Sequence, residues 1–139
     1  MEPIILKYHV DGENFSSAGE ASSATKKTLK QLGFSPDVVR KVAIAMYEGE
    51  INMVIHAEGG EATVEILQDS ICVVLADHGP GIKDINLAMQ EGYSTAPEEV
   101  RNLGFGAGMG LPNIKKYSDD LKIESIPGVG TTLTIFINT

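Results

Sequence analysis

Two polar side chains near the middle of the chain have the types and spacing that phosphate chemistry uses. Glu48 and Asn52 are four residues apart, so on a helix both would project from the same face. A carboxylate in this position can accept a proton from a hydroxyl group, and a carboxamide oxygen can bind Mg²⁺. A polar pair at this spacing is also typical of an ordinary solvated helix face, and the spacing alone does not decide between the two.

An acidic residue and two glycines form a second group. Asp77, Gly79 and Gly81 directly follow the apolar run 71–76. Glycines let a loop approach a flat ligand closely. The carboxylate can accept a hydrogen bond from an exocyclic amine such as that of adenine. The alternative is an ordinary turn that contains Asp.

The third group is a glycine repeat that contains Gly106, Gly108 and Gly110. Glycines expose backbone N–H groups, and a helix starting at Leu111 would add the positive end of its dipole, so this segment predicts a phosphate cradle. The repeat lacks the Gly-Lys-Ser/Thr ending of a Walker A loop, and no apolar strand precedes it as in a Rossmann fingerprint. A plain flexible loop is the alternative.

The elements that must position these groups are predicted from hydrophobic periodicity and from start and stop signals. Helix 36–57 has the clearest start, because Ser35 can cap it, Pro36 suits the first helical position and Asp37 favours the positive end of the dipole. Strand 70–76 is almost entirely apolar, which predicts a central strand. The other predicted elements are strand 4–10, helix 16–32, strand 62–67, a loop or lid over 83–103, helix 111–117, and strands 122–126 and 131–137. This order indicates an α/β (α+β) two-layer sandwich, a mixed β-sheet with helices packed on one face.

Composition narrows the class of protein. The 139 residues fit one domain, and an apolar content of 42% is enough for a hydrophobic core. Nineteen acidic and eleven basic residues give a net charge of −8, which argues against binding to nucleic acid or to an anionic membrane. We expect a cytoplasmic protein, because the first residues lack the apolar core of a signal peptide and no apolar stretch is long enough for a membrane span. The single cysteine, Cys72, is predicted to be buried in a strand.

The three groups together resemble, in order and spacing, the N, G1 and G2 boxes of the GHKL ATPase superfamily over residues 44–112. The segment 127–132 is similar to the last hairpin of that superfamily. The resemblance implies a Bergerat-type ATP-binding fold, with residues 1–139 as a single GHKL (HATPase-type) domain. A stand-alone domain of this size resembles the bacterial anti-sigma-factor serine kinases, and the segments 91–95 and 104–125 are most similar to the stressosome switch-kinase (RsbT-like) branch.

The resemblance also implies a role for each residue that matches a box. Glu48 would be the catalytic carboxylate that accepts or orients the proton of a substrate hydroxyl group, and Asn52 would bind Mg²⁺. Asp77 would contact adenine, while Gly79 and Gly81 would shape the pocket around it.

The remaining matches concern the phosphates and the far side of the base. Gly106, Gly108 and Gly110 would line the phosphates of ATP, and Leu111 would begin the helix behind them. Thr131 would lie near adenine and reach it through water.

The resemblance implies protein partners, and it leaves more than one function open. The expected reaction is phosphorylation of a serine or threonine on a STAS-domain anti-sigma-factor antagonist or stressosome scaffold. A sigma factor, a serine phosphatase or a second copy of the chain could also bind. One alternative is an ATP-gated binding or sequestering switch with little transfer activity. Another is a small-molecule kinase or a detached histidine-kinase-like ATPase.

Overall fold

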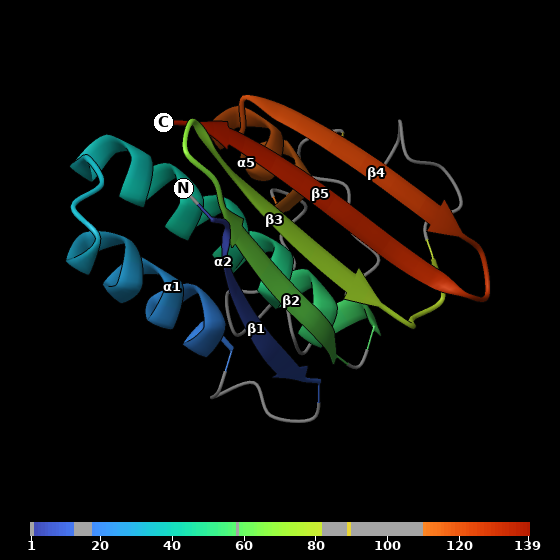
Figure 1. Cartoon of the computed structure of the whole chain (residues 1–139). Coiled ribbons are helices and arrows are strands. Elements are labelled where there is room, and N and C mark those ends of the chain that lie inside the picture. The colour runs from blue at the N-terminus through green and yellow to red at the C-terminus, as the bar shows by residue number, and fades with distance from the viewer. Residues whose placement is uncertain (1, 13–17, 58, 82–88, 90–109) are drawn as a thin grey trace.

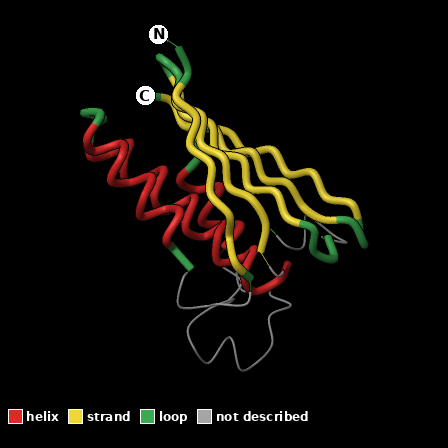
Figure 2. Tube along the Cα trace, turned by 60° about the horizontal axis from the view of Figure 1, so that its bottom comes forward, coloured by secondary structure: helices red, strands yellow, loops and turns green. Residues whose placement is uncertain are grey.

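The computed structural model describes residues 2–12, 18–57, 59–81, 89 and 110–139. Within this part the helices form one layer and a five-stranded sheet forms the other, so the predicted sandwich is confirmed (Figure 2). The strand order is β1-β2-β3-β5-β4, which confirms β3 as the predicted central strand. The described elements, in chain order, are β1 (Ile4–Asp11), α1 (Glu20–Gln31), α2 (Pro36–Ala57), β2 (Gly59–Ile66), β3 (Ser70–Asp77), α5 (Gly110–Tyr117), β4 (Asp120–Ile126) and β5 (Gly130–Asn138).

The sheet differs from the predicted mixed sheet in one respect, because all four pairings between the described strands are antiparallel. Short turns at 67–69 and 127–129 join β2 to β3 and β4 to β5, and such hairpins can pair only in this way. Between β1 and β2 the chain runs back along α1 and forward along α2 (Figure 1). An antiparallel helix pair inserted between two strands returns the chain so that β2 also runs antiparallel to β1.

The core lies between the helices and one face of the sheet. Along each strand alternate residues point towards the helices, and in the middle of the sheet Val64, Val73 and Ile135 are neighbours across three strands and fully buried. Cys72 falls on the opposite face and is only half-buried, so the prediction of a buried cysteine was wrong. The cause is the two-residue period of β3, which assigns Ile71 and its alternate neighbours to the core and leaves Cys72 outside it.

The ends of the helices follow from local chemistry. The Val38 backbone N–H donates to Ser35 Oγ at 3.3 Å, which confirms the predicted cap of α2. Helix α1 begins at Glu20 rather than at 16, because Gly19 has φ +98° and cannot belong to a right-handed helix. Residues 16 and 17 lie outside the described residues. No described helix combines the length and the apolar character that a membrane span needs.

Candidate functional site

Helix α2 carries Glu48 and Asn52 one turn apart, and both side chains are half-buried. Between them Gly49 lies where α2 meets both β3 and α5. A Cβ atom on Gly49 would collide with the side chain of Leu75 and lie 3.8 Å from Ile114 Cδ1. A glycine at this position therefore lets the segment with Glu48 and Asn52 pack closely against the other two elements.

The carboxyl group of Glu48 has an altered affinity for protons. Burial raises its pKa above the ordinary value, and a hydrogen bond with the Asn113 side chain lowers the pKa by a smaller amount. Asn113 is in the first turn of α5. A carboxylate with a raised pKa is a stronger proton acceptor, which suits it to activate a hydroxyl group.

Asp77, the last residue of β3, organises the loop that follows it. Its Oδ1 atom accepts backbone N–H groups from Gly79 and from Thr131, each at 3.0 Å. The other carboxylate oxygen, Oδ2, has no hydrogen bond to any residue that the structure describes, so it can accept one from a ligand amine. Thr131 is 8% exposed, and its hydroxyl group lies 2.9 Å from Ser125 Oγ. Asp77 can therefore hold its turn through Oδ1 and accept a hydrogen bond from a ligand through Oδ2 at the same time.

Two further contacts hold the Asp77 loop against the β4–β5 hairpin. The Gly128 N–H donates to the Pro80 carbonyl oxygen at 2.7 Å. Gly81 has φ +78°, and a Cβ there would lie 2.6 Å from the Ile126 carbonyl oxygen, so only glycine fits without strain. Gly81 therefore allows a close approach to the backbone of the hairpin, while its predicted role in shaping a pocket around adenine stays a prediction.

The carboxyl ends of α2 and β3 lie at the same end of the molecule (Figure 1). Met53, the neighbour of Asn52, links them. A Cβ on Gly60 would lie 2.6 Å from Met53 Cε and 2.9 Å from Asp77 Cα. The structure thus places the Asn52 region of α2 beside the end of β3, where Asp77 begins its loop.

The glycine repeat is described only at its end. Gly110 is the first residue of α5, and Leu111 is 9% exposed and packs into the core. Gly106 and Gly108, and the predicted lid over 83–103 apart from Met89, lie outside the described residues. The phosphate cradle therefore remains a prediction from the sequence.

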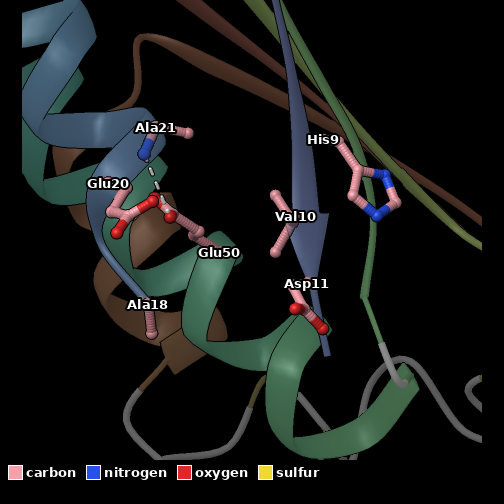
Figure 3. Close-up of a pocket in the computed structure, with 7 residues that line it drawn as sticks. All are labelled: His9, Val10, Asp11, Ala18, Glu20, Ala21 and Glu50. Atoms are coloured by element: carbon pink, nitrogen blue, oxygen red, sulfur yellow. Dashed lines mark hydrogen bonds between the residues drawn. The ribbon is translucent and has the colours of Figure 1, made fainter. Parts of the chain in front are cut away.

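Glu50 has a different task from Glu48, on the other side of α2. Its carboxylate accepts the backbone N–H groups of Gly19, Ala21 and Ser22 at 2.7, 3.2 and 3.0 Å. Figure 3 shows this carboxylate pointing from α2 to the start of α1, beside a small pocket. The side chain is 2% exposed. Glu50 thus satisfies N–H groups that the first turn of α1 leaves free.

Sequence reasoning missed the contacts of two of these residues, Asn113 and Glu50. Asn113 had one available signal, since it is a carboxamide three residues after the last glycine of the repeat. The contact of Glu50 with Gly19 spans 31 residues of the sequence, and no local sequence pattern predicts it. The sequence indicated only that Glu50 faces away from Glu48, because residues two apart on a helix differ by about 200°.

The donor set bears on which ligands the site can hold. Among the residues that the structure describes, no three His, Cys, Asp or Glu side chains gather closely enough to bind a metal ion. A single carboxamide at Asn52 fits Mg²⁺ only as an ion shared with phosphate oxygens and water, which is the coordination Mg²⁺ usually adopts. Asp77 Oδ2, which has no hydrogen bond to a described residue, fits an adenine amine. The described residues are therefore compatible with a Mg²⁺–nucleotide ligand.

Comparisons with known proteins concern the family and the fold of the chain. The model of the histidine kinase-like ATPase domain matches residues 14–137. The serine/threonine-protein kinase RsbT of Bacillus subtilis (strain 168) is 30% identical over 112 residues, which are 78% of this chain and 78% of that protein. The anti-sigma F factor of Caldanaerobacter subterraneus subsp. tengcongensis is 35% identical over 131 residues, which are 91% of this chain and 86% of that protein.

One solved structure provides a comparison of folds. A crystal structure of the RsbU and RsbW domains of a Mycobacterium tuberculosis protein matches with a TM-score of 0.61 and 15% sequence identity. The match covers 99% of this chain and 32% of that longer one. At this level of identity the match concerns the fold alone.

Proposed function

The chain belongs to the histidine kinase-like ATPase domain family, and we propose that it is an ATP-dependent serine/threonine protein kinase of a bacterial partner-switching system. The GHKL-type fold expected from the three boxes is confirmed by the family match and the structural match. The kinase activity, the protein substrate and the roles of the individual residues are the proposal.

The observation that carries the proposal is the setting of Glu48. A half-buried carboxylate with a raised pKa, on the helix face that also presents Asn52, is suited to accept a proton from a hydroxyl group. A protein that only binds ATP does not need such a group. The relative named as a serine/threonine-protein kinase, at 30% identity, supports the same activity.

Each residue of the site has a distinct part in the proposed transfer of the γ-phosphoryl group from ATP to a hydroxyl oxygen. Asp77 Oδ2 accepts a hydrogen bond from the adenine amine and so orients the nucleotide. Asn52 would hold Mg²⁺, and the ion would neutralise charge on the phosphates. Glu48 accepts the proton as the hydroxyl oxygen forms its bond to phosphorus and ADP leaves. Asn113 holds the Glu48 carboxylate by a hydrogen bond in the position this requires.

The proposed substrate is a serine or threonine on a STAS-domain anti-sigma-factor antagonist or scaffold. The support is the resemblance to switch kinases and the relatives named as anti-sigma F factors. Phosphorylation would add a charge of about −1.5 to −2 to the partner's surface, enough to break a docked complex. A sigma factor, a serine phosphatase and a second copy of this chain are further proposed partners.

A second candidate function is an ATP-gated binding switch with little transfer activity. The relative named anti-sigma F factor is 35% identical and matches 91% of this chain, which favours a binding role. Glu48 would then be retained as part of the nucleotide pocket rather than for proton transfer.

One experiment separates the two functions. The purified chain is incubated with radiolabelled ATP, Mg²⁺ and a STAS-domain protein encoded beside it, in parallel with the Glu48→Gln variant. The kinase proposal predicts a labelled serine or threonine that disappears with Glu48→Gln while nucleotide affinity stays within about twofold. Nucleotide-dependent binding of the STAS-domain protein without any labelling would overturn the kinase and establish the switch.

A further inference from the structure

The basic residues of this acidic protein are unevenly distributed. Seven of the eleven lie on the three described helices, which carry four acidic residues. Two of those four, Glu48 and Glu50, are half-buried or buried. A third, Asp37, is paired with Lys41 at 3.4 Å. The three described helices therefore expose more positive than negative side chains, on a chain of net charge −8.

Two of these cations meet on one aromatic ring. The Arg40 guanidinium, from α2, lies 5.8 Å from the centroid of the Tyr117 ring, and Lys116 Nζ, from α5, lies 5.6 Å from it. We refer to Arg40, Lys116 and Tyr117 as the Tyr117 cluster. The ring attracts both cations, while their like charges repel each other. Both cations are exposed, and neither forms an ion pair with a carboxylate in the part of the chain that the structure describes.

Helix electrostatics explains only part of this cluster. Lys116 is in the last turn of α5, where a cation stabilises the negative end of the helix dipole. Arg40 is near the N-terminal, positive end of α2, where the helix dipole does not stabilise a cation. The helix dipoles therefore explain the position of Lys116 but not the position of Arg40.

The position of the cluster relates it to the proposed site. Helices α2 and α5 pack together so that Glu48 meets Asn113 at one level and Arg40 meets Tyr117 at another. Along α2 these levels are about 12 Å apart at roughly 1.5 Å per residue. A protein interface of ordinary size, about 800 Å² on each partner, spans more than that distance. One bound partner can therefore cover both the cluster and Glu48.

We propose that the Tyr117 cluster is the docking site for an acidic surface patch of the protein whose hydroxyl group is phosphorylated. This deepens the proposed function and rests on it. Carboxylates of the partner would neutralise the two cations held on the ring, while the seryl or threonyl hydroxyl group lies towards Glu48. Docking by charge would fix the register of the partner before transfer and would speed its association.

The test is a double charge reversal with a matched control. Arg40→Glu/Lys116→Glu changes the cluster, and Lys27→Glu/Lys30→Glu makes the same change of net charge on α1, which flanks α2 on the side away from α5 (Figure 1). All four residues are exposed, so both variants should keep the wild-type thermal midpoint. Binding of the STAS-domain protein used above is measured by calorimetry at about 0.05 and about 0.3 M salt, and ATP affinity is measured beside it.

The proposal expects the cluster variant to weaken partner binding by about tenfold or more at low salt and to flatten its salt dependence, with ATP affinity unchanged. In transfer assays KM for the partner rises while kcat at saturation is kept. The α1 variant should change binding by about twofold or less. Equal losses in both variants, or no loss in the cluster variant, would overturn the docking site and leave the kinase standing. Binding without transfer in the wild type would overturn the kinase, while the comparison of variants would still decide the docking site.

Discussion

Two carboxylates of α2, Glu48 and Glu50, are separated by a single glycine and occupy opposite environments. Glu50 is almost fully buried and accepts three backbone N–H groups from the start of α1. Glu48 is half-buried, has a raised pKa and forms a hydrogen bond with one carboxamide, that of Asn113. The two side chains leave the same helix about 200° apart.

The difference shows that burial alone does not decide what a carboxylate does. A buried carboxylate whose oxygen atoms already accept several N–H groups holds two segments of the chain together. A carboxylate that has lost water but gained few donors keeps unused capacity to accept a proton. On α2, Glu50 fixes the helix against α1. This contact holds the helix in place, and with it the position of Glu48.

The largest expected effect comes from Glu48→Gln. The variant keeps the shape of the side chain and one acceptor oxygen but removes the proton acceptor, so transfer should fall by about 10²- to 10⁴-fold. The free energy of unfolding at neutral pH should stay level or rise, because a half-buried charge is gone. Single-turnover transfer and urea unfolding measure the two quantities. A large loss of stability would show that Glu48, like Glu50, is structural.

Glu50→Ala should give the opposite result. It leaves three N–H groups at the start of α1 without their acceptor, and we expect a loss of about 3–5 kcal/mol in the free energy of unfolding. Since that could unfold the chain, Glu50→Gln serves as the milder variant, with an expected loss of about 1–3 kcal/mol. Urea unfolding with amide hydrogen exchange in α1 measures both. If Glu50→Gln is as stable as the wild type but inactive, the contrast between the two carboxylates fails.

Asp77→Asn tests the nucleotide end of the site. Its remaining Oδ1 atom can still accept the N–H groups of Gly79 and Thr131, so the loop should keep its shape. The amide group that replaces Oδ2 cannot accept the adenine amine, and ATP binding should weaken by about 1.5–3 kcal/mol. Calorimetric titration with ATP measures the loss, and GTP serves as the control because its base lacks that amine. Wild-type affinity for ATP would remove Asp77 from the site.

Much of the architecture around the site was accessible from local patterns. The cap at Ser35, the end of β3 at Asp77 and the start of α5 at Gly110 each depend on residues close together in the chain, and the structure has these elements within a residue of the predictions. The predicted mixed sheet was wrong, because the direction of β1 depends on how α1 and α2 fold back on each other. That arrangement is a tertiary feature, and the sequence of a single strand does not indicate it.

The same division holds within the site. The four-residue spacing of Glu48 and Asn52 predicted that they share a face, because residues four apart on a helix always do. The partners of the two glutamates could not be predicted, because Glu50 meets α1 across 31 residues and Glu48 meets Asn113 on a helix far along the chain. Gly49 stands between them for a reason visible only in three dimensions, the contact with Leu75 and Ile114.

The smallest expected effect concerns pH. Because burial raises the pKa of Glu48, the acidic limb of the pH profile of kcat/KM should lie above the ordinary glutamate value of about 4.3. Asn113→Ala removes the hydrogen bond that lowers this pKa, so the limb should move to still higher pH. A limb that stays in place would show that Glu48 is not the titrating group.

Stability provides the independent check on the same group. Between the unfolded pKa of Glu48 and its raised folded pKa, the folded state binds more protons than the unfolded state, so stability falls as pH rises through this window. The wild type should therefore lose stability relative to Glu48→Gln on going from acidic to neutral pH. A Glu48→Gln difference that is independent of pH would mean that folding leaves the pKa of Glu48 unchanged, and the proposed role of Glu48 would then rest on its position alone.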